Sequence, residues 1–371
     1  MSRQSSMTTD IFPPQDVVPQ HRNSSSPKQL SINPDDGDLQ VTFLDWVKGH
    51  AGYSNDVWHD DDDEAWINCM QQRGIATELQ QAIMDPDFKY MRMTGTCLTW
   101  LRDTIKMRYA ALEEIQRQRA IQRANSRPCG SGLPEDLAGQ RSISDMTIGS
   151  CSSASALAAL DAPGMTVLFK AVDSARNTRL LDAQGKLSNA MELASTTPSD
   201  FSRNMAMLYF TTSFAVAKRH AAWIKRRAKS ELVVVIIRIA IRNSVIERLP
   251  EGKVQHLYWP DADWKEFVWR YRTRKRSTPS LRKYADATLV IGPMANKPNS
   301  YYHNFESGSQ LTEASVLKVD GQYAIQFAFS TDEEGEDLIL EAAPTLQMFL
   351  FTPTDMQVWI RGRQQAENLE S

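Results

Sequence analysis

The chain has 371 residues, which is enough for two ordinary domains. Its 42 Lys and Arg against 45 Asp and Glu give a net charge of -3, a balance that argues neither for nor against a nucleic-acid partner. The four cysteines contain no CxxC pair, so a disulfide framework and a zinc site are not expected. The first residues lack the apolar core of a signal peptide, and no apolar run is long enough to cross a bilayer. We expect a cytoplasmic or nuclear protein with no membrane segment.

Composition divides the chain into five parts. Residues 1–38 are rich in Ser, Pro, Gln and Asp, and cannot bury enough apolar surface to offset chain entropy, so we expect a disordered tail. Residues 126–162 are rich in Ser and Gly and are expected to be a flexible linker. These two segments predict a helical domain at 39–125, an α+β domain at 163–352 and a C-terminal tail at 353–371.

An acidic run in the N-terminal block, Asp60 to Glu64, precedes the apolar residues Ala65 to Met70. Acidic side chains in a first turn interact favourably with the helix dipole, so we expect a helix to start here. Carboxylates also bind hard cations, but the run lacks the spaced ligands and the glycine of a calcium loop, and we expect no metal site. Gly74 is expected to end this helix, and Asp85-Pro86 to break the next one.

A longer helix is predicted from Phe88 to Ala124, because apolar residues recur there at steps of three and four. This stripe consists of Leu98, Leu101, Ile105, Tyr109, Leu112 and Ile115. We expect the stripe to pack in a core. A groove that binds a protein partner is the alternative interpretation for residues 39–125.

The C-terminal block alternates strands with a few helices. Strands are predicted at 166–172, 208–211, 232–241, 287–291, 324–330 and 347–351, and helices at 214–228, 261–269 and 333–341. Ser213 occupies the position of an N-cap before the first of these helices. The mixed order favours an α+β fold over a doubly wound sheet.

Two strand-to-helix junctions stand out, because in each an apolar strand leads into small hydroxyl residues. They are LYFTTS at 208–213 and QFAFST at 326–331. Four further segments accompany them in the C-terminal block, namely LFKAV at 168–172, DF at 200–201, WKEFV at 264–268 and IGPMAN at 291–296. Taken in the order in which they occur along the chain, the six segments resemble the motifs of uncharacterised ADP-ribosyltransferase-like domains found in bacteria and fungi. The whole chain also resembles a group of uncharacterised fungal proteins.

The resemblance implies a split α+β sheet that binds NAD in a cleft between strands. It implies that Lys170 contacts the ribose or phosphates and that Tyr209 stacks on nicotinamide. Thr211, Thr212 and Ser213 would order the cleft. A core aromatic role for Tyr209 and a helix-cap role for Ser213 remain open as alternatives.

The same resemblance places Gln326 in the catalytic motif, but Ala328 stands where active members usually carry a catalytic glutamate. Cleavage of the bond to nicotinamide develops positive charge on the ribose, which a nearby carboxylate stabilises. Gln326 can donate or accept a hydrogen bond but carries no charge. The acidic residues just beyond, 332–336, are expected to start a helix instead.

Two basic clusters, 218–229 and 270–276, could bind a phosphate backbone, and residues 272–276 could also act as a nuclear localisation signal. A solvated surface is the simpler interpretation, and a nucleic-acid partner is not expected. The sequence therefore predicts a module that binds NAD or ADP-ribose and has weak or lost transferase activity. The alternative is a non-catalytic interaction scaffold that docks through its N-terminal helices.

Overall fold

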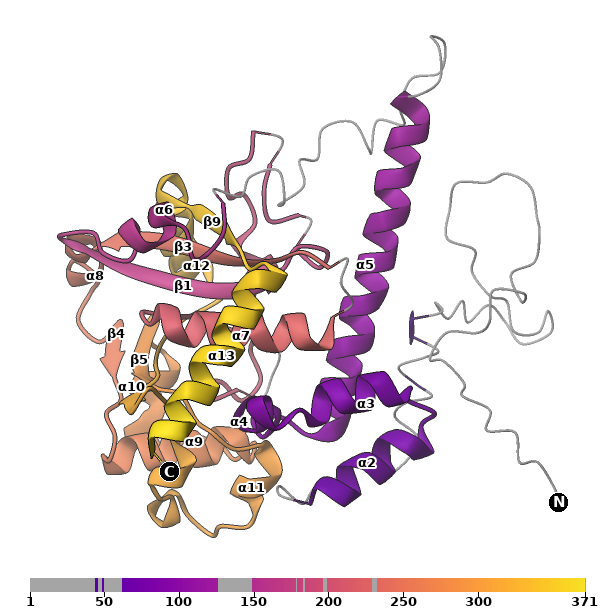
Figure 1. Ribbon diagram of the computed structural model, residues 1–371. Coiled ribbons are helices and arrows are strands. Elements are labelled where there is room, and N and C mark those ends of the chain that lie inside the picture. Colours follow the sequence, from indigo (N-terminus) through magenta and orange to yellow (C-terminus); the bar gives the residue numbers. More distant parts are fainter. Residues whose placement is uncertain are drawn as a thin grey trace, which may run out of the picture.

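The computed structural model describes residues 62–125 and 149–370, except 178, 183, 196–198 and 229–231, together with 44, 45 and 49. The predicted disordered tail at 1–38 and the first part of the predicted linker, 126–148, lie outside the described residues. Helices surround a seven-stranded mixed sheet with the order β4-β5-β8-β2-β1-β3-β9 (Figure 1). The prediction of a mixed α+β architecture is therefore confirmed.

Neighbouring strands of the sheet are antiparallel, apart from the parallel pair β4–β5. Six of the strands fall where the apolar pattern predicts them. The seven strands are β1 (Met165–Asp173), β2 (Leu208–Thr211), β3 (Val234–Arg242), β4 (Val254–His256), β5 (Leu289–Pro293), β8 (Ile325–Phe329) and β9 (Gln347–Leu350). The sequence pattern missed β4 and a small separate hairpin of β6 (Lys318–Val319) and β7 (Gln322–Tyr323).

The sheet is nearly divided between β1 and β2. Strand β1 pairs with β3 along all its 9 residues, but it pairs with β2 only where Phe169 faces Thr211. On the far side of this division, β2 and β8 pair in a register that sets Thr211 opposite Gln326. The C-terminal end of β2 therefore lies beside the N-terminal end of β8, and the two strand-to-helix junctions lie at opposite ends of this antiparallel pair.

The N-terminal block forms α2 (Asp63–Gln72), α3 (Thr77–Met84), α4 (Lys89–Arg92) and α5 (Cys97–Asn125). The predicted helix start in the acidic run is confirmed, since the Asp62 side chain accepts a hydrogen bond from Ala65 N at 3.0 Å.

The prediction of one continuous helix from Phe88 to Ala124 is wrong, because the chain leaves the helix between α4 and α5. Thr94 Oγ1 donates to Met91 O at 2.7 Å, and Thr96 Oγ1 accepts from Thr99 N at 3.2 Å. Such side-chain bonds compete with the helical pattern, and the intervening Gly95 is a poor helix former. The resulting turn becomes part of the site described below.

The N-terminal helices share a core with the sheet. One apolar cluster contains Trp66, Phe88 and Leu101 from these helices together with Trp223 from α7 (Phe214–Arg227) and Ile236 from β3. The predicted boundary between 39–125 and 163–352 therefore does not separate two cores.

Two segments predicted as linker and tail contain regular structure. In the second part of the linker, Cys151 N donates to Leu350 O at 2.8 Å beside the edge strand β9, and α6 (Ala154–Ala158) follows. The predicted tail at 353–371 is largely the helix α13 (Pro353–Glu370). Asp355 joins the two segments, because it accepts hydrogen bonds from Ser150 Oγ at 2.8 and 2.9 Å.

Three apolar clusters show which helices cover each face of the sheet. One face of the sheet packs against α12 (Glu333–Glu341), whose Leu338 and Ile339 are buried there. On the opposite face, α7 and the N-terminal helices cover one half of the sheet. The other half is covered by α9 (Ala262–Arg272), α10 (Arg282–Ala285) and α11 (Asn299–His303). None of the described helices is both long and apolar enough to span a membrane.

Candidate functional site

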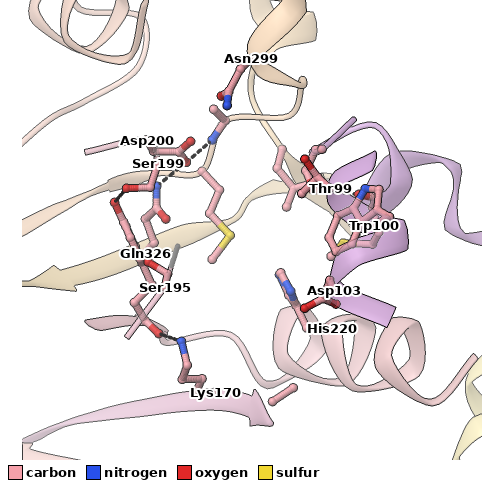
Figure 2. A pocket seen from close by; sticks show the side chains of 18 of the residues that line it. Thr99, Trp100, Asp103, Lys170, Ser195, Ser199, Asp200, His220, Asn299 and Gln326 are labelled. Atoms are coloured by element: carbon pink, nitrogen blue, oxygen red, sulfur yellow. Dashed lines mark hydrogen bonds between the residues drawn. The ribbon is translucent and has the colours of Figure 1, made fainter. Parts of the chain in front are cut away.

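A cavity of about 940 Å³ lies where the two covered halves of this face meet (Figure 2). Strands β1, β2 and β8 contribute to its lining, as do α7 and the C-terminal end of α9. The N-terminal helices supply a further wall, which is built from the turn 94–96 and the first turns of α5. This wall includes Thr99, Trp100 and Asp103, none of which sequence reasoning had assigned to a site.

Four of the six predicted site residues line the cavity: Lys170, Tyr209, Thr211 and Gln326. The other two lie outside the lining. Thr212 is exposed, and Ser213 caps α7 by accepting a hydrogen bond from Val216 N at 3.3 Å. The helix-cap interpretation of Ser213 is therefore confirmed.

The hydroxyl of Tyr209 is already held by the protein. It is hydrogen-bonded to Ser199 Oγ at 2.8 Å and accepts from Phe201 N at 3.0 Å. The ring packs against the apolar cluster beneath α9, and burial raises the pKa of the phenol above its usual range. Tyr209 thus shapes the wall of the cavity as an uncharged, oriented aromatic.

Thr211 likewise has a structural role at the lining. Its Oγ1 donates to Ile325 O at 2.8 Å and accepts from Ser213 N at 3.1 Å. These bonds tie the end of β2 to the start of β8 and to the first turn of α7.

Gln326 belongs to a buried network centred on Asp200, whose exposed fraction is 6%. Asp200 Oδ2 accepts from Gln326 Nε2 at 2.7 Å and from Ala295 N at 2.8 Å, and Oδ1 accepts from Arg272 Nε at 2.8 Å. Arg272 also donates to Asn299 Oδ1 at 3.0 Å. A carboxylate paired with an arginine can only accept hydrogen bonds, so the amide of Gln326 must direct its NH₂ group to Asp200. This leaves the carbonyl oxygen of Gln326 as an acceptor for donor groups of a ligand.

Lys170 stands apart from this network. Its Nζ donates to Tyr209 O at 3.0 Å, across the division between β1 and β2. Burial lowers the pKa of this amine to about 8, and no carboxylate among the described residues pairs with it. Lys170 is therefore a cation at neutral pH that the protein does not neutralise.

A second ion-pair network fixes the N-terminal wall. Asp103 on α5 accepts from Arg176 at 2.5 Å and from Arg227 on α7 at 2.6 Å. The guanidinium of Arg227 lies 4.7 Å from the ring centroid of Trp100 and equally far from that of Trp223. Burial alone would raise the pKa of Asp103, but the charges of the two arginines outweigh it and lower this pKa to about 2.

Cationic side chains outnumber acidic ones in the described lining. Both acids, Asp103 and Asp200, are paired with arginines. The cations are Arg102, Lys106, Lys170, Arg176, Arg272 and Arg274. The cavity is therefore electropositive and fits an anionic ligand.

The basic clusters predicted as solvated surface are partly internal, and for Arg219, Arg227 and Arg272, which are buried, that prediction is wrong. Arg272 is buried because it forms the ion pair with Asp200, whereas Arg274 to Arg276 are exposed as expected. In the other cluster, Arg226 pairs with Asp85 and Arg227 with Asp103. The two sequence runs therefore do not form uniform cationic surfaces for a nucleic acid.

Two lining residues that sequence reasoning did not assign to the site are Asp200 and His220. Asp200 carried a weak signal, since Asp200-Phe201 is one of the segments on which the family resemblance rests. His220 carried none, because a single histidine on an amphipathic helix has no distinguishing pattern. Among the described residues, no group of three or more His, Cys, Asp or Glu side chains could hold a metal ion.

Comparison with known proteins adds no constraint. No family model matches the chain, no curated protein matches it, and no solved structure matches it. The chemistry of the cavity therefore has to be argued from its own residues.

Proposed function

We propose that the cavity binds an anionic nucleotide of the NAD or ADP-ribose class, and that any transferase activity is weak or lost. The observation that carries the proposal is that one cavity contains both a cation and a neutral hydrogen-bond acceptor. Lys170 is a cation with no carboxylate partner among the described residues, while Gln326 is neutral and oriented as an acceptor. A dinucleotide has both complements, since its phosphates are anionic and its ribose hydroxyls donate hydrogen bonds. A volume of about 940 Å³ is within the usual range for such ligands.

Weak or lost catalysis is supported by the state of the carboxylates. A transferase of this kind needs negative charge beside the ribose as the bond to nicotinamide breaks. In the described lining, each carboxylate is paired with at least one arginine, and Gln326 has no charge. Loss of one charged transition-state partner typically costs about 3–4 kcal/mol, or roughly 10²–10³ in rate.

The binding half of the proposal is tested by calorimetry on the full chain with NAD, ADP-ribose and, separately, nicotinamide. We expect the two nucleotides to bind and their affinities to fall with added salt, because the anion contact is electrostatic. Lys170→Met keeps the aliphatic stem and removes the charge, and it should weaken binding at least tenfold. Lys283→Met is the matched control, since Lys283 pairs with Asp263 and does not line the cavity. Absence of heat with millimolar NAD and ADP-ribose would refute the proposal.

The catalytic half is tested by incubating the protein with labelled NAD and measuring incorporated label. We expect no more than trace incorporation over hours. Rapid incorporation that Gln326→Leu abolishes would show that the site is catalytic after all.

Docking through the N-terminal helices remains the second candidate. The first half of the apolar stripe, including Leu98 and Leu101, is buried in the shared core. Leu112 is 43% exposed and lies further along α5, so the apolar surface available to a partner is smaller than the sequence suggests. We therefore favour the nucleotide proposal.

A further inference from the structure

We propose that His220 is a binding residue of this cavity: an anionic group of the ligand lies between His220 and Lys170, and the imidazole takes up one proton from solvent as that group binds. This inference rests on the proposed function and specifies how the ligand is held. It also predicts a coupling between nucleotide affinity and pH.

The first support is the placement of the histidine. His220 lies on α7, lines the cavity and points into it (Figure 2). Its Nε2 atom is enclosed and has no hydrogen-bond partner among the described residues. Buried polar atoms in folded proteins are almost always hydrogen-bonded, so an unpartnered ring nitrogen beside a cavity points to a group that arrives from outside.

The second support is the charge around the ring. The charge of Lys170, on β1, acts on the ring across the cavity, and Arg219 precedes the ring on α7. From α5 the cavity receives Asp103 and Lys106, and Arg176 follows β1. The charge of Asp103 is compensated by Arg176 and Arg227, so no unpaired carboxylate among the described lining residues favours the imidazolium.

These surroundings keep the ring neutral in the free protein. Burial, followed by the charges of Lys170 and Arg219, lowers the pKa of His220 to about 4. A phosphate oxygen in the same space would reverse this balance, because an anion stabilises the charged form of a neighbouring imidazole. Ligand binding and protonation of His220 should therefore strengthen one another, since linkage is reciprocal.

The sign of the pH dependence follows from this coupling. The pKa of His220 is about 4 without ligand and higher with it. Affinity should be constant above the pKa in the complex and rise by up to tenfold per pH unit as the pH falls from there toward 4. Lys170 acts in a separate range, because its pKa of about 8 means that its charge is lost only in more alkaline solution. A change in affinity between pH 5.5 and 6.5 thus reports on the histidine, whereas near pH 7.5 a fraction of Lys170 is uncharged and takes up protons as well.

The experiment is calorimetry of the full chain with ADP-ribose between pH 5.5 and 7.5, in buffers of different ionisation enthalpy. The pyrophosphate diester of ADP-ribose keeps its charge in this range, so protons counted from the buffer dependence belong to the protein. We expect proton uptake on binding and an affinity at least fivefold higher at pH 5.5 than at 7.5. His220→Gln should abolish the proton uptake at pH 5.5 to 6.5 and most of the change in affinity, leaving the smaller contribution of Lys170 near pH 7.5. His303→Gln, at an exposed histidine that also lines the cavity, should retain both effects.

The possible failures are distinguishable. If ADP-ribose does not bind at any pH, the proposed function fails and the inference fails with it. If ADP-ribose binds without proton uptake, or if His220→Gln retains the uptake, the nucleotide site stands and the role of His220 is refuted. The role of His220 would also be refuted if His303→Gln, and not His220→Gln, abolished the proton uptake. A proton count of zero in the unmodified protein would refute the role of His220 even if a variant folds poorly.

Discussion

Asp103→Asn is the substitution that most directly tests how the N-terminal helices are held against the rest of the fold. It keeps the size of the side chain and removes its charge. Arg227, whose exposed fraction is 1%, then lacks an anionic partner and keeps only Thr104 Oγ1 at 3.0 Å and the two tryptophan rings. Breaking such a pair is unfavourable because a buried charge is left uncompensated.

The expected loss of stability follows from the pKa of the Asp103 carboxyl group. Its exposed fraction is 28%, and its pKa is lowered from 3.8 to about 2 in the folded protein. At about 1.36 kcal/mol per pKa unit, this difference contributes about 2.4 kcal/mol to the free energy of unfolding at pH 7. Since the folded pKa is the lower one, the contribution is complete above pH 4 to 5 and is lost as the pH falls toward 2. About 2.2 kcal/mol should remain at pH 4 and about 1.3 kcal/mol at pH 3.

The assay is urea unfolding followed by tryptophan fluorescence at pH 7, 4 and 3. Asp103→Asn should be less stable than the unmodified protein by about 2–3 kcal/mol at pH 7, and the gap should roughly halve at pH 3. Asp63→Asn is the control, because the Arg92–Asp63 pair has a carboxylate that is 55% exposed and should contribute less than about 1 kcal/mol. An equal loss of stability in both variants, or a gap for Asp103→Asn that does not shrink with pH, would refute this account of the network.

Three other perturbations test the packing. Gly335→Ala should destabilise the protein by about 1–3 kcal/mol in thermal melts, because the added Cβ would clash with Ser330 O. In contrast, the added Cβ of Gly362→Ala on α13 meets nothing within 4 Å, and this substitution should stabilise the protein by up to about 1 kcal/mol. Ala328 is fully buried outside the cavity lining, so Ala328→Glu should cost more than about 3 kcal/mol and yield no incorporation of label from NAD. A fragment of residues 163–352 exposes the core that it shares with the N-terminal helices, so it should show no cooperative unfolding and no ADP-ribose binding. A cooperative fragment that binds, or transfer restored by the glutamate, would contradict these expectations.

The sequence predicts the sheet well, and the reason is its burial. Six strands come from apolar runs that are enclosed on both faces, such as β3, in which eight successive residues are buried. The missed β4 has two half-buried residues and one exposed residue, and so no comparable pattern. The helix break before α5 was missed because the apolar stripe begins at Leu98, within α5, and its spacing does not mark where the helix starts. The hydroxyl groups of Thr94 and Thr96 end α4 and start α5.

The cavity could be predicted only where its residues belong to a recurring motif. The family resemblance implies that the strands of the two junctions bound one cleft, and in the structure β2 and β8 are neighbours whose ends line the cavity. The bond between Gln326 and Asp200 joins residues 126 positions apart, and Asp103 comes from a helix that sequence reasoning assigned to another domain. Neither the Gln326–Asp200 bond nor the position of Asp103 in the cavity wall could be predicted from the local sequence, because such contacts depend on how whole elements pack.

The charged and polar groups of the cavity differ in what the fold requires of them. Asp103 and Asp200 are compensated by arginines and connect elements, so their burial is explained by structure. The burial of Lys170 and His220 is not explained in this way: among the described residues, the amine donates one hydrogen bond, to a backbone carbonyl, and the enclosed imidazole nitrogen makes none. Enclosing such groups lowers stability unless a partner arrives, and proteins keep violations of this kind mainly at functional sites. The two groups that folding does not explain are therefore the two that a phosphate would satisfy, which is why we place the anion of the ligand between them.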